Sequence, residues 1–226
     1  MIGAGREPLA AIVFDLDDTL IATRRLYTDA YLDALELHFG RRLSEAELAA
    51  MRPGPENHFI GAAVSPELVS ETLERFYLTY EARHPEAFGG VYHGVAKLLE
   101  DLNAAGLPLG IFTGKTQRAW NITARHVSLQ TIHAWVFGDE IERPKPAPDG
   151  ILVALAKLDV PPSKAAYVGD SVLDIAAARA AGVMPLAALW SMKAPAQAVL
   201  RRAAHEAGGA ALSHPSEIMS LVRSAG

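Results

Sequence analysis

Residues 9–19 read LAAIVFDLDDT, an apolar run that ends in three acids and a threonine. The apolar part, residues 9–14, is continuous, includes β-branched and aromatic residues, and is too short for a helix. These properties predict a strand buried on both faces, as in a parallel sheet. Asp15, Asp17 and Asp18 follow it directly, where carboxylates are costly unless a cation compensates their charge. The same three acids also fit a solvated turn or a helix cap.

Similar apolar runs recur along the chain and alternate with helical segments. The strand-like runs lie at residues 107–112, 135–137, 165–168 and 184–189. The helical segments keep helical spacing, begin after a proline or end before a glycine, and they lie at residues 95–102, 149–158 and 171–181. This alternation predicts βαβ units and an α/β fold with a doubly wound, Rossmann-like parallel sheet.

Residues 23–88 interrupt the alternation, because their sequence holds helix signals and no strand-like run. Ser44 and Glu47 form a capping box before a helix, and Ser65 followed by Pro66 indicates another helix start. We therefore predict an all-helical cap domain at residues 23–88, inserted between a first core segment at 1–22 and a second at 89–226.

The composition excludes several classes of protein. The chain has 226 residues, of which 50% are hydrophobic, and a formal net charge of −5. This allows a full core and argues against disorder and against a nucleic-acid binder, which would carry a basic face. The lack of cysteine excludes disulfides, thiol catalysis and thiolate zinc sites. No apolar stretch approaches the roughly 20 residues of a bilayer span, and no leader-like segment is visible. We expect a cytoplasmic monomer or homodimer without membrane or nucleic-acid partners.

Polar side chains follow three later strands as well. Thr113 and Gly114 offer a hydroxyl and an accessible amide, which suit a phosphate but are also a common helix cap. Lys145 lies in the turn RPKPAPD, whose prolines stiffen the backbone, although it could be a surface lysine. Asp170 and Asp174 are four residues apart at a helix start, so they project to one side, although acids there also complement the helix dipole.

Each of these sets has an ordinary structural explanation, but four successive strand ends with complementary polar residues are unlikely to coincide. Together they resemble the haloacid dehalogenase superfamily of phosphotransferases. The resemblance spans nearly the whole chain and rests on DLDDT at 15–19, Thr113, Lys145 in RPKPAPD, and GDSVLD at 169–174. A small helical cap in this position is typical of the subgroup that holds phosphoglycolate phosphatases, related pyrophosphatases, β-phosphoglucomutases, phosphonatases and the haloacid dehalogenases.

The resemblance implies roles for the catalytic residues. Asp15 would attack phosphorus to give an aspartyl-phosphate. Asp17 would protonate the leaving group and then accept a proton from the hydrolytic water. Lys145 would offset the negative charge of the nucleophile and the phosphoryl group.

The resemblance also implies Mg²⁺ as the cofactor. Its protein ligands would be the Asp15 carboxylate, the Asp17 backbone carbonyl and Asp170, with Asp174 acting through water or orienting the other ligands. The Thr113 hydroxyl and the Gly114 amide would hold phosphate oxygens.

Three features narrow the subgroup. Haloacid dehalogenases lack the acid at Asp17, phosphonatases use a cap lysine whereas the first lysine here is Lys97, and residues 24–27 (RRLY) lack the histidine of β-phosphoglucomutases. We therefore expect a phosphatase of small phosphorylated metabolites, of the phosphoglycolate phosphatase type. A pyrophosphatase, a nucleotidase, and a sugar-phosphate phosphatase or phosphomutase remain alternatives, as does a non-catalytic phosphate-binding relative. A receiver domain fits less well, because its acceptor aspartate follows a later strand.

Substrate specificity is expected to come from the cap. Arg52 and His58 are candidate substrate-binding residues near the rigid sequence MRPGP, and the other candidates are Arg24, Arg25 and Asn57. Arg52 would suit a substrate carboxylate. Any of these residues could equally be a solvated surface side chain.

Overall fold

The computed structural model describes residues 8–51, 54–129 and 131–223. Within these ranges, six strands form one parallel sheet in the order β3-β2-β1-β4-β5-β6. Their bounds are β1 Ala11–Phe14, β2 Leu109–Phe112, β3 Ala134–Val136, β4 Ala165–Gly169, β5 Met184–Ala188 and β6 Ala210–Leu212. The doubly wound parallel sheet predicted from the sequence is confirmed, and β6 is an additional edge strand.

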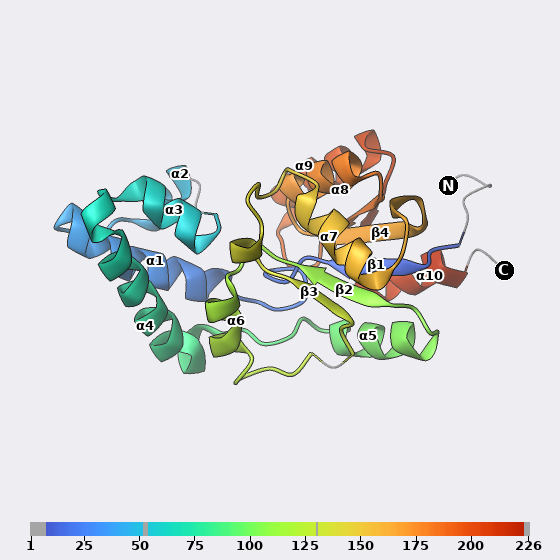
Figure 1. The fold of residues 1–226 in the computed structure, drawn as a ribbon, viewed down its shortest axis with the longest axis horizontal. Helices are drawn as coiled ribbons and strands as arrows, with labels where there is room; N and C mark the ends of the chain where they lie inside the picture. The colour runs from blue at the N-terminus through green and yellow to red at the C-terminus, as the bar shows by residue number, and fades with distance from the viewer. Residues whose placement is uncertain (1–7, 52–53, 130, 224–226) are drawn as a thin grey trace.

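Helices cover both faces of the sheet (Figure 1). One face is covered by α7 (Asp149–Leu158), α8 (Val172–Ala181) and α9 (Ala194–Glu206), and the other by α5 (Val95–Ala104) and α10 (Ile218–Arg223).

The central strand β1 shows how the sequence specifies these two layers. Ala11 and Val13 pack in the cluster that contains α7 and α8. Ile12 and Phe14 pack in the cluster that contains α5. Successive side chains of a strand point to opposite faces, and helices cover both faces of this sheet. All four side chains are therefore fully buried. The continuous apolar run therefore places the acids that follow it at the carboxyl edge of the sheet.

A separate helical bundle lies between β1 and α5 in the sequence, at the left of Figure 1. Its elements are α1 (Arg24–Phe39), α2 (Glu45–Ala50), α3 (Glu56–Ala63), a 3₁₀ turn (Pro66–Leu68) and α4 (Val69–Ala87). It has a core of its own, built on Leu26, Tyr31, Leu35, Phe59 and Phe76. We call this bundle the cap, and its exact boundaries at 23 and 88 remain a prediction.

The chain enters and leaves the cap at one crossing. The Ala22 amide donates to the Gly90 carbonyl at 2.8 Å, and the Gly89 amide donates to the Ala22 carbonyl at 2.9 Å. A Cβ at Gly89 would lie 2.7 Å from the Ala22 Cβ. This close pairing of the two linkers requires glycine and ties the position of the cap to the end of β1.

The cap also docks on the core helix α6 (Gln117–Thr123). Tyr77 and Tyr80 of α4 share hydrogen bonds of 3.0 Å with Thr116 and Thr123, respectively. Two exposed ion pairs add to this contact: Arg118 of α6 pairs with Glu74, and Arg125, in the turn after α6, pairs with Glu81. The cap therefore lies closed over the carboxyl edge of the sheet.

Several predicted helix starts can be compared with the structure. The Ser44–Glu47 capping box is present, whereas Ser65 precedes the 3₁₀ turn and makes no side-chain capping bond. The helix expected directly after Gly114 begins only at Gln117, capped by the Thr116 hydroxyl. Among the residues described, no helix combines the length and apolar character needed to cross a membrane.

Candidate active site

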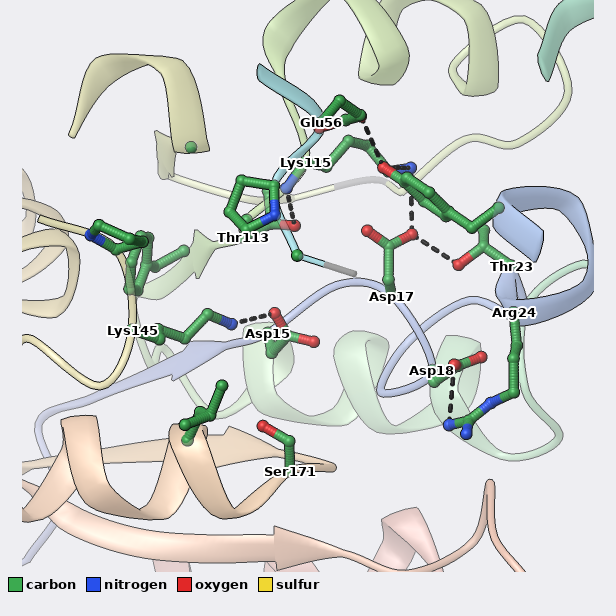
Figure 2. Close-up of a pocket in the computed structure, with 18 of the residues that line it drawn as sticks. Asp15, Asp17, Asp18, Thr23, Arg24, Glu56, Thr113, Lys115, Lys145 and Ser171 are labelled. Carbon is green, nitrogen blue, oxygen red and sulfur yellow. Dashed lines mark hydrogen bonds and ion pairs between the residues drawn. The ribbon is translucent and has the colours of Figure 1, made fainter. Parts of the chain in front are cut away.

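Loops at the carboxyl ends of the strands meet around a cavity of about 320 Å³. Asp15 and Asp17 follow β1, Thr113 and Gly114 follow β2, and Lys145 lies in the loop after β3; all five line the cavity. Figure 2 shows Lys145 directed at Asp15, with Thr113 across the same space. The structure thus brings together residues from distant parts of the sequence.

Lys145 connects two of the acids. Its Nζ lies 2.6 Å from Asp15 Oδ1 and 2.8 Å from Asp174 Oδ1. Burial disfavours the ammonium, but Asp15 and Asp174 outweigh this and raise the pKa of Lys145 well above its usual value. Lys145 is therefore a permanent positive charge beside the Asp15 carboxyl.

Tyr167 is a part of this site that sequence reasoning missed. Its hydroxyl accepts a hydrogen bond from Lys145 Nζ at 3.2 Å and donates to the Phe112 carbonyl at 2.9 Å. The residue lies in β4 among apolar neighbours, so the sequence pattern indicated only a core position. The available signal was a tyrosine in a buried strand, two residues before the GDSVLD motif that begins at Gly169.

Asp15, Asp170 and Asp174 each place a carboxylate oxygen within 4.8 Å of the others. Burial raises the pKa of Asp15 to about 7, with Lys145 opposing and Asp174 adding to the shift. Burial and the two neighbouring acids also raise the pKa of Asp170 well above its usual value. With all three acids ionised, the cluster would hold three negative charges against the one positive charge of Lys145 and the exposed Arg24, and its oxygen ligands fit a hard divalent cation such as Mg²⁺.

Asp174 is held by the start of α8. Its Oδ2 accepts hydrogen bonds from the Ser171 hydroxyl at 2.5 Å and the Ser171 amide at 3.0 Å. Because Oδ1 binds Lys145, both oxygens have protein partners. This arrangement suits a residue that orients the cluster.

The Asp17 side chain is oriented away from the acidic cluster. Its Oδ1 accepts a hydrogen bond from the Thr23 hydroxyl at 2.6 Å and lies 3.1 Å from Lys115 Nζ. In Figure 2 the other oxygen points toward the space between Thr113 and Asp15. Only the backbone carbonyl of Asp17 was expected to bind metal, and this side-chain orientation leaves the carboxyl available for proton transfer.

The Thr113–Gly114 loop is packed tightly against its neighbour. Thr113 is buried, and its hydroxyl accepts the Lys115 amide at 3.1 Å. Gly138 donates its amide to the Lys115 carbonyl at 2.9 Å, and a Cβ at Gly138 would lie 2.2 Å from the Gly114 carbonyl oxygen. Glycine is therefore required at Gly138, another residue that the sequence did not single out.

The candidate cap residues occupy different positions. Arg24 Nη2 lies 3.0 Å from Asp18 and 3.4 Å from Asp170 at the rim of the cavity. His58 is exposed and does not line the cavity, because the inward face of α3 carries Glu56, Phe59 and Ile60. The remaining candidates are Asn57, which is exposed, Arg25, which pairs with Asp29, and Arg52, which lies outside the described residues.

A second charged cluster lies between cap and core. Lys115 and Glu56 are fully buried, and Tyr27 donates its hydroxyl to Glu56 Oε1 at 2.8 Å. Burial raises the pKa of Glu56 to about 6, with Lys115 opposing the shift. The sequence did not point to this cluster, because its three members come from separate segments of the chain.

Comparisons with known proteins show to which family the chain belongs. The chain matches the family described as haloacid dehalogenase-like hydrolase over residues 12–188. It is 31% identical over 183 residues to pyrophosphatase PpaX of Anoxybacillus flavithermus, and the match covers 80% of this chain and 84% of that protein. It is 30% identical over 191 residues to phosphoglycolate phosphatase of Pseudomonas savastanoi pv. phaseolicola, which covers 80% and 69%, respectively.

The fold has counterparts among solved structures. The crystal structure of CbbY from Rhodobacter sphaeroides in complex with phosphate has a TM-score of 0.69 at 23% identity, and the match covers 80% of this chain and 86% of that one. The family match spans most of the chain and contains every motif residue that meets at the cavity. The chain therefore belongs to the haloacid dehalogenase-like hydrolase family and is a phosphatase.

Proposed function

We propose that this phosphatase hydrolyses small phosphorylated metabolites with the help of Mg²⁺ and through an aspartyl-phosphate at Asp15. The observation that carries the proposal is the arrangement around the cavity. Asp15 is paired with Lys145 and clustered with two further acids, while the Asp17 carboxyl is turned toward the space between Asp15 and Thr113.

In the first step, an Asp15 oxygen forms a bond to phosphorus as the bond from phosphorus to the leaving oxygen breaks. Asp17 gives its proton to that leaving oxygen. Two like unit charges at 4 Å repel by about 4 kcal/mol at an effective dielectric of about 20, so the attack needs positive charge nearby. Lys145 supplies one such charge, 2.6 Å from the nucleophile. Bound Mg²⁺ would add charge stabilisation of the phosphoryl oxygens, held by Asp15, Asp170, Asp174 and the Asp17 carbonyl.

In the second step, the oxygen of a water molecule attacks phosphorus, and Asp17 accepts a proton from that water molecule. The bond between phosphorus and Asp15 breaks, which releases phosphate and restores the carboxylate. The Thr113 hydroxyl and the Gly114 amide would hold the phosphoryl oxygens in both steps. Gly138 packs against this loop on the core side.

The proposed substrate class is a phosphomonoester with a small leaving group, of the phosphoglycolate type. The cavity of about 320 Å³ under the closed cap suits a small metabolite. Arg52 remains a proposed partner for a substrate carboxylate. Pyrophosphate is the second candidate, because a curated pyrophosphatase is 31% identical to this chain.

The proposal is tested with a panel of phosphorylated compounds and purified protein in Mg²⁺. The panel contains p-nitrophenyl phosphate, phosphoglycolate, pyrophosphate, nucleotides and sugar phosphates, and D15N serves as the control. We expect the highest kcat/KM for a small phosphomonoester, with no turnover by D15N. Release of phosphate from pyrophosphate alone would favour the second candidate, and binding of phosphate without turnover would contradict the proposed function.

A further inference from the structure

Lys115 is a buried cation that the proposed reaction does not use. The residue borders the cavity, but its side chain is fully enclosed and its ammonium contacts Asp17 and two phenols of the cap. Burial works against its charge, but the surrounding acids and phenols, Asp17 foremost, hold its pKa above the usual lysine value. Burying an ammonium group costs free energy unless it is fully paired. The partners of Lys115 therefore indicate its role.

On the core side, the partner of Lys115 is Asp17. Its Nζ lies 3.1 Å from Asp17 Oδ1, the oxygen that also accepts the Thr23 hydroxyl at 2.6 Å. Two donors on one oxygen fix the rotation of the carboxyl group. The second oxygen, which faces the cavity in Figure 2, is thereby set in the direction of a bound phosphate ester.

On the cap side, two phenols hold the same ammonium. Nζ donates to Tyr80 Oη at 2.6 Å and to Tyr27 Oη at 3.0 Å, and it lies 4.8 Å and 4.4 Å from the centres of the two rings. Tyr27 in turn donates to Glu56, whose Oε2 accepts the Thr116 amide of the core at 3.2 Å. Helices α1, α3 and α4 of the cap therefore all contribute to the position of Lys115.

We propose that Lys115 is a positioning residue for Asp17, held in place by the Tyr27 and Tyr80 hydroxyls of the closed cap. The inference rests on the proposed role of Asp17 as proton donor and deepens it. An Asp17 carboxyl without Lys115 keeps only the Thr23 bond on Oδ1 and can rotate away from the leaving oxygen.

This role predicts that the effect of losing Lys115 depends on the leaving group. An alkoxide must be protonated as it departs, whereas p-nitrophenolate is stable as an anion near neutral pH. Misplacing Asp17 should therefore lower kcat/KM for an alkyl phosphate much more than for p-nitrophenyl phosphate. A general structural defect would lower both alike.

The experiment measures kcat/KM of the wild type, D17N, K115M and the double variant D17N/K115M with both substrates. The alkyl phosphate is the one that the wild type hydrolyses fastest in the panel above. We expect K115M to lose roughly 10²-fold on it, within the range of general acid–base groups, and less than about tenfold on p-nitrophenyl phosphate. Adding K115M to D17N should cause little further loss, because a residue that acts through Asp17 has nothing left to position.

Two controls separate this role from a folding effect. K97M removes a lysine that is exposed on α5 and should behave as the wild type. If K115M does not fold, E56Q is compared with E56Q/K115M, a pair in which fewer buried charges are left unpaired. The same dependence on leaving group should then appear between these two proteins.

The outcomes distinguish the two proposals. Equal losses of K115M on both substrates, no loss on the alkyl phosphate, or a full further loss in D17N/K115M would overturn the positioning role while the function stands. If D17N itself shows no dependence on the leaving group, the proposed role of Asp17 fails, and the role of Lys115 fails with it.

Discussion

The Lys145 ammonium lies 2.6 Å from Asp15 although 130 residues separate the two in the chain. The contact forms because parallel strands bring their carboxyl ends to one edge of the sheet. Asp174 shares the same ammonium at 2.8 Å, so removing one acid leaves Lys145 paired. This makes substitutions at Asp15 interpretable, since the fold should survive them.

We predict that D15N abolishes turnover and keeps the fold. The amide cannot act as a nucleophile toward phosphorus, but its oxygen can still accept a hydrogen bond from Lys145. Circular dichroism and thermal unfolding should match the wild type within a few degrees, the shift that about 1 kcal/mol produces in a chain of this size. Near-normal activity in D15N would refute the assignment of Asp15.

Metal removal should stop the reaction. EDTA is expected to abolish hydrolysis, and excess Mg²⁺ to restore it. Mg²⁺ should also raise the melting temperature, because a ligand at 100 times its Kd stabilises the folded state by about 2.7 kcal/mol. In D170N, which lacks one of the three clustered acids, the same Mg²⁺ concentration should give a smaller rise. A rate unaffected by EDTA would remove the metal from the account.

Glu56 should make stability depend on pH. Its pKa is about 6 in the folded chain against 4.5 as the ordinary value, so the folded state binds the proton more tightly than the unfolded state. The contribution of Glu56 to the free energy of unfolding is present in full below pH 4.5 and is lost as the pH rises through 6. The total loss is about 2 kcal/mol.

E56Q isolates this contribution, because glutamine does not titrate. Denaturant unfolding should show that the free energy of unfolding of E56Q increases relative to that of the wild type between pH 4.5 and 6. A constant difference between the two proteins across this range would contradict the shifted pKa of Glu56.

Gly138→Ala should disturb phosphate binding. The added Cβ would lie 2.2 Å from the Gly114 carbonyl oxygen, so the two loops must separate, at a cost of about 1–3 kcal/mol in stability. KM should rise for every substrate, because all of them share the phosphoryl group. The control is Gly61→Ala, where a Cβ meets nothing within 4 Å. If Gly138→Ala and Gly61→Ala have the same KM, the Gly114 loop does not hold the phosphate.

Arg52→Ala tests the proposed carboxylate partner in the cap. It should raise KM for carboxylated substrates and leave p-nitrophenyl phosphate unaffected. Arg83→Ala, on an exposed arginine of α4 that pairs with Glu86, is the matched control. An equal rise of KM on both kinds of substrate would exclude Arg52 from substrate selection.

The sequence predicts most of the core for a physical reason. Strands buried on both faces, such as β1, are continuous apolar runs, and the polar residues that follow them lie at one sheet edge. The strand β6 (Ala210–Leu212) was not predicted, since two partly buried alanines and one leucine are too short a run to carry such a pattern. Ser65 was expected to cap a helix, but the chain first makes a 3₁₀ turn there.

The cluster around Lys115 could not be predicted in the same way. Tyr27 and Tyr80 lie on helices α1 and α4 of the cap, and the sequence of a helix does not show which neighbour a hydroxyl will contact. Glu56 resembles an ordinary acid at a helix start, and Lys115 follows a motif without belonging to it. Only the docking of cap on core, which involves residues far apart in sequence, makes these four side chains a site.

The central claim is a covalent phosphoryl group on Asp15, and trapping it is the most direct test. Wild type and D17N are mixed with p-nitrophenyl phosphate and quenched with borohydride, which reduces an aspartyl-phosphate to homoserine. Peptide mass spectrometry should find homoserine at position 15, more abundantly in D17N, where hydrolysis of the intermediate is slow. Unmodified Asp15 in both proteins while nitrophenol is being released would contradict the account.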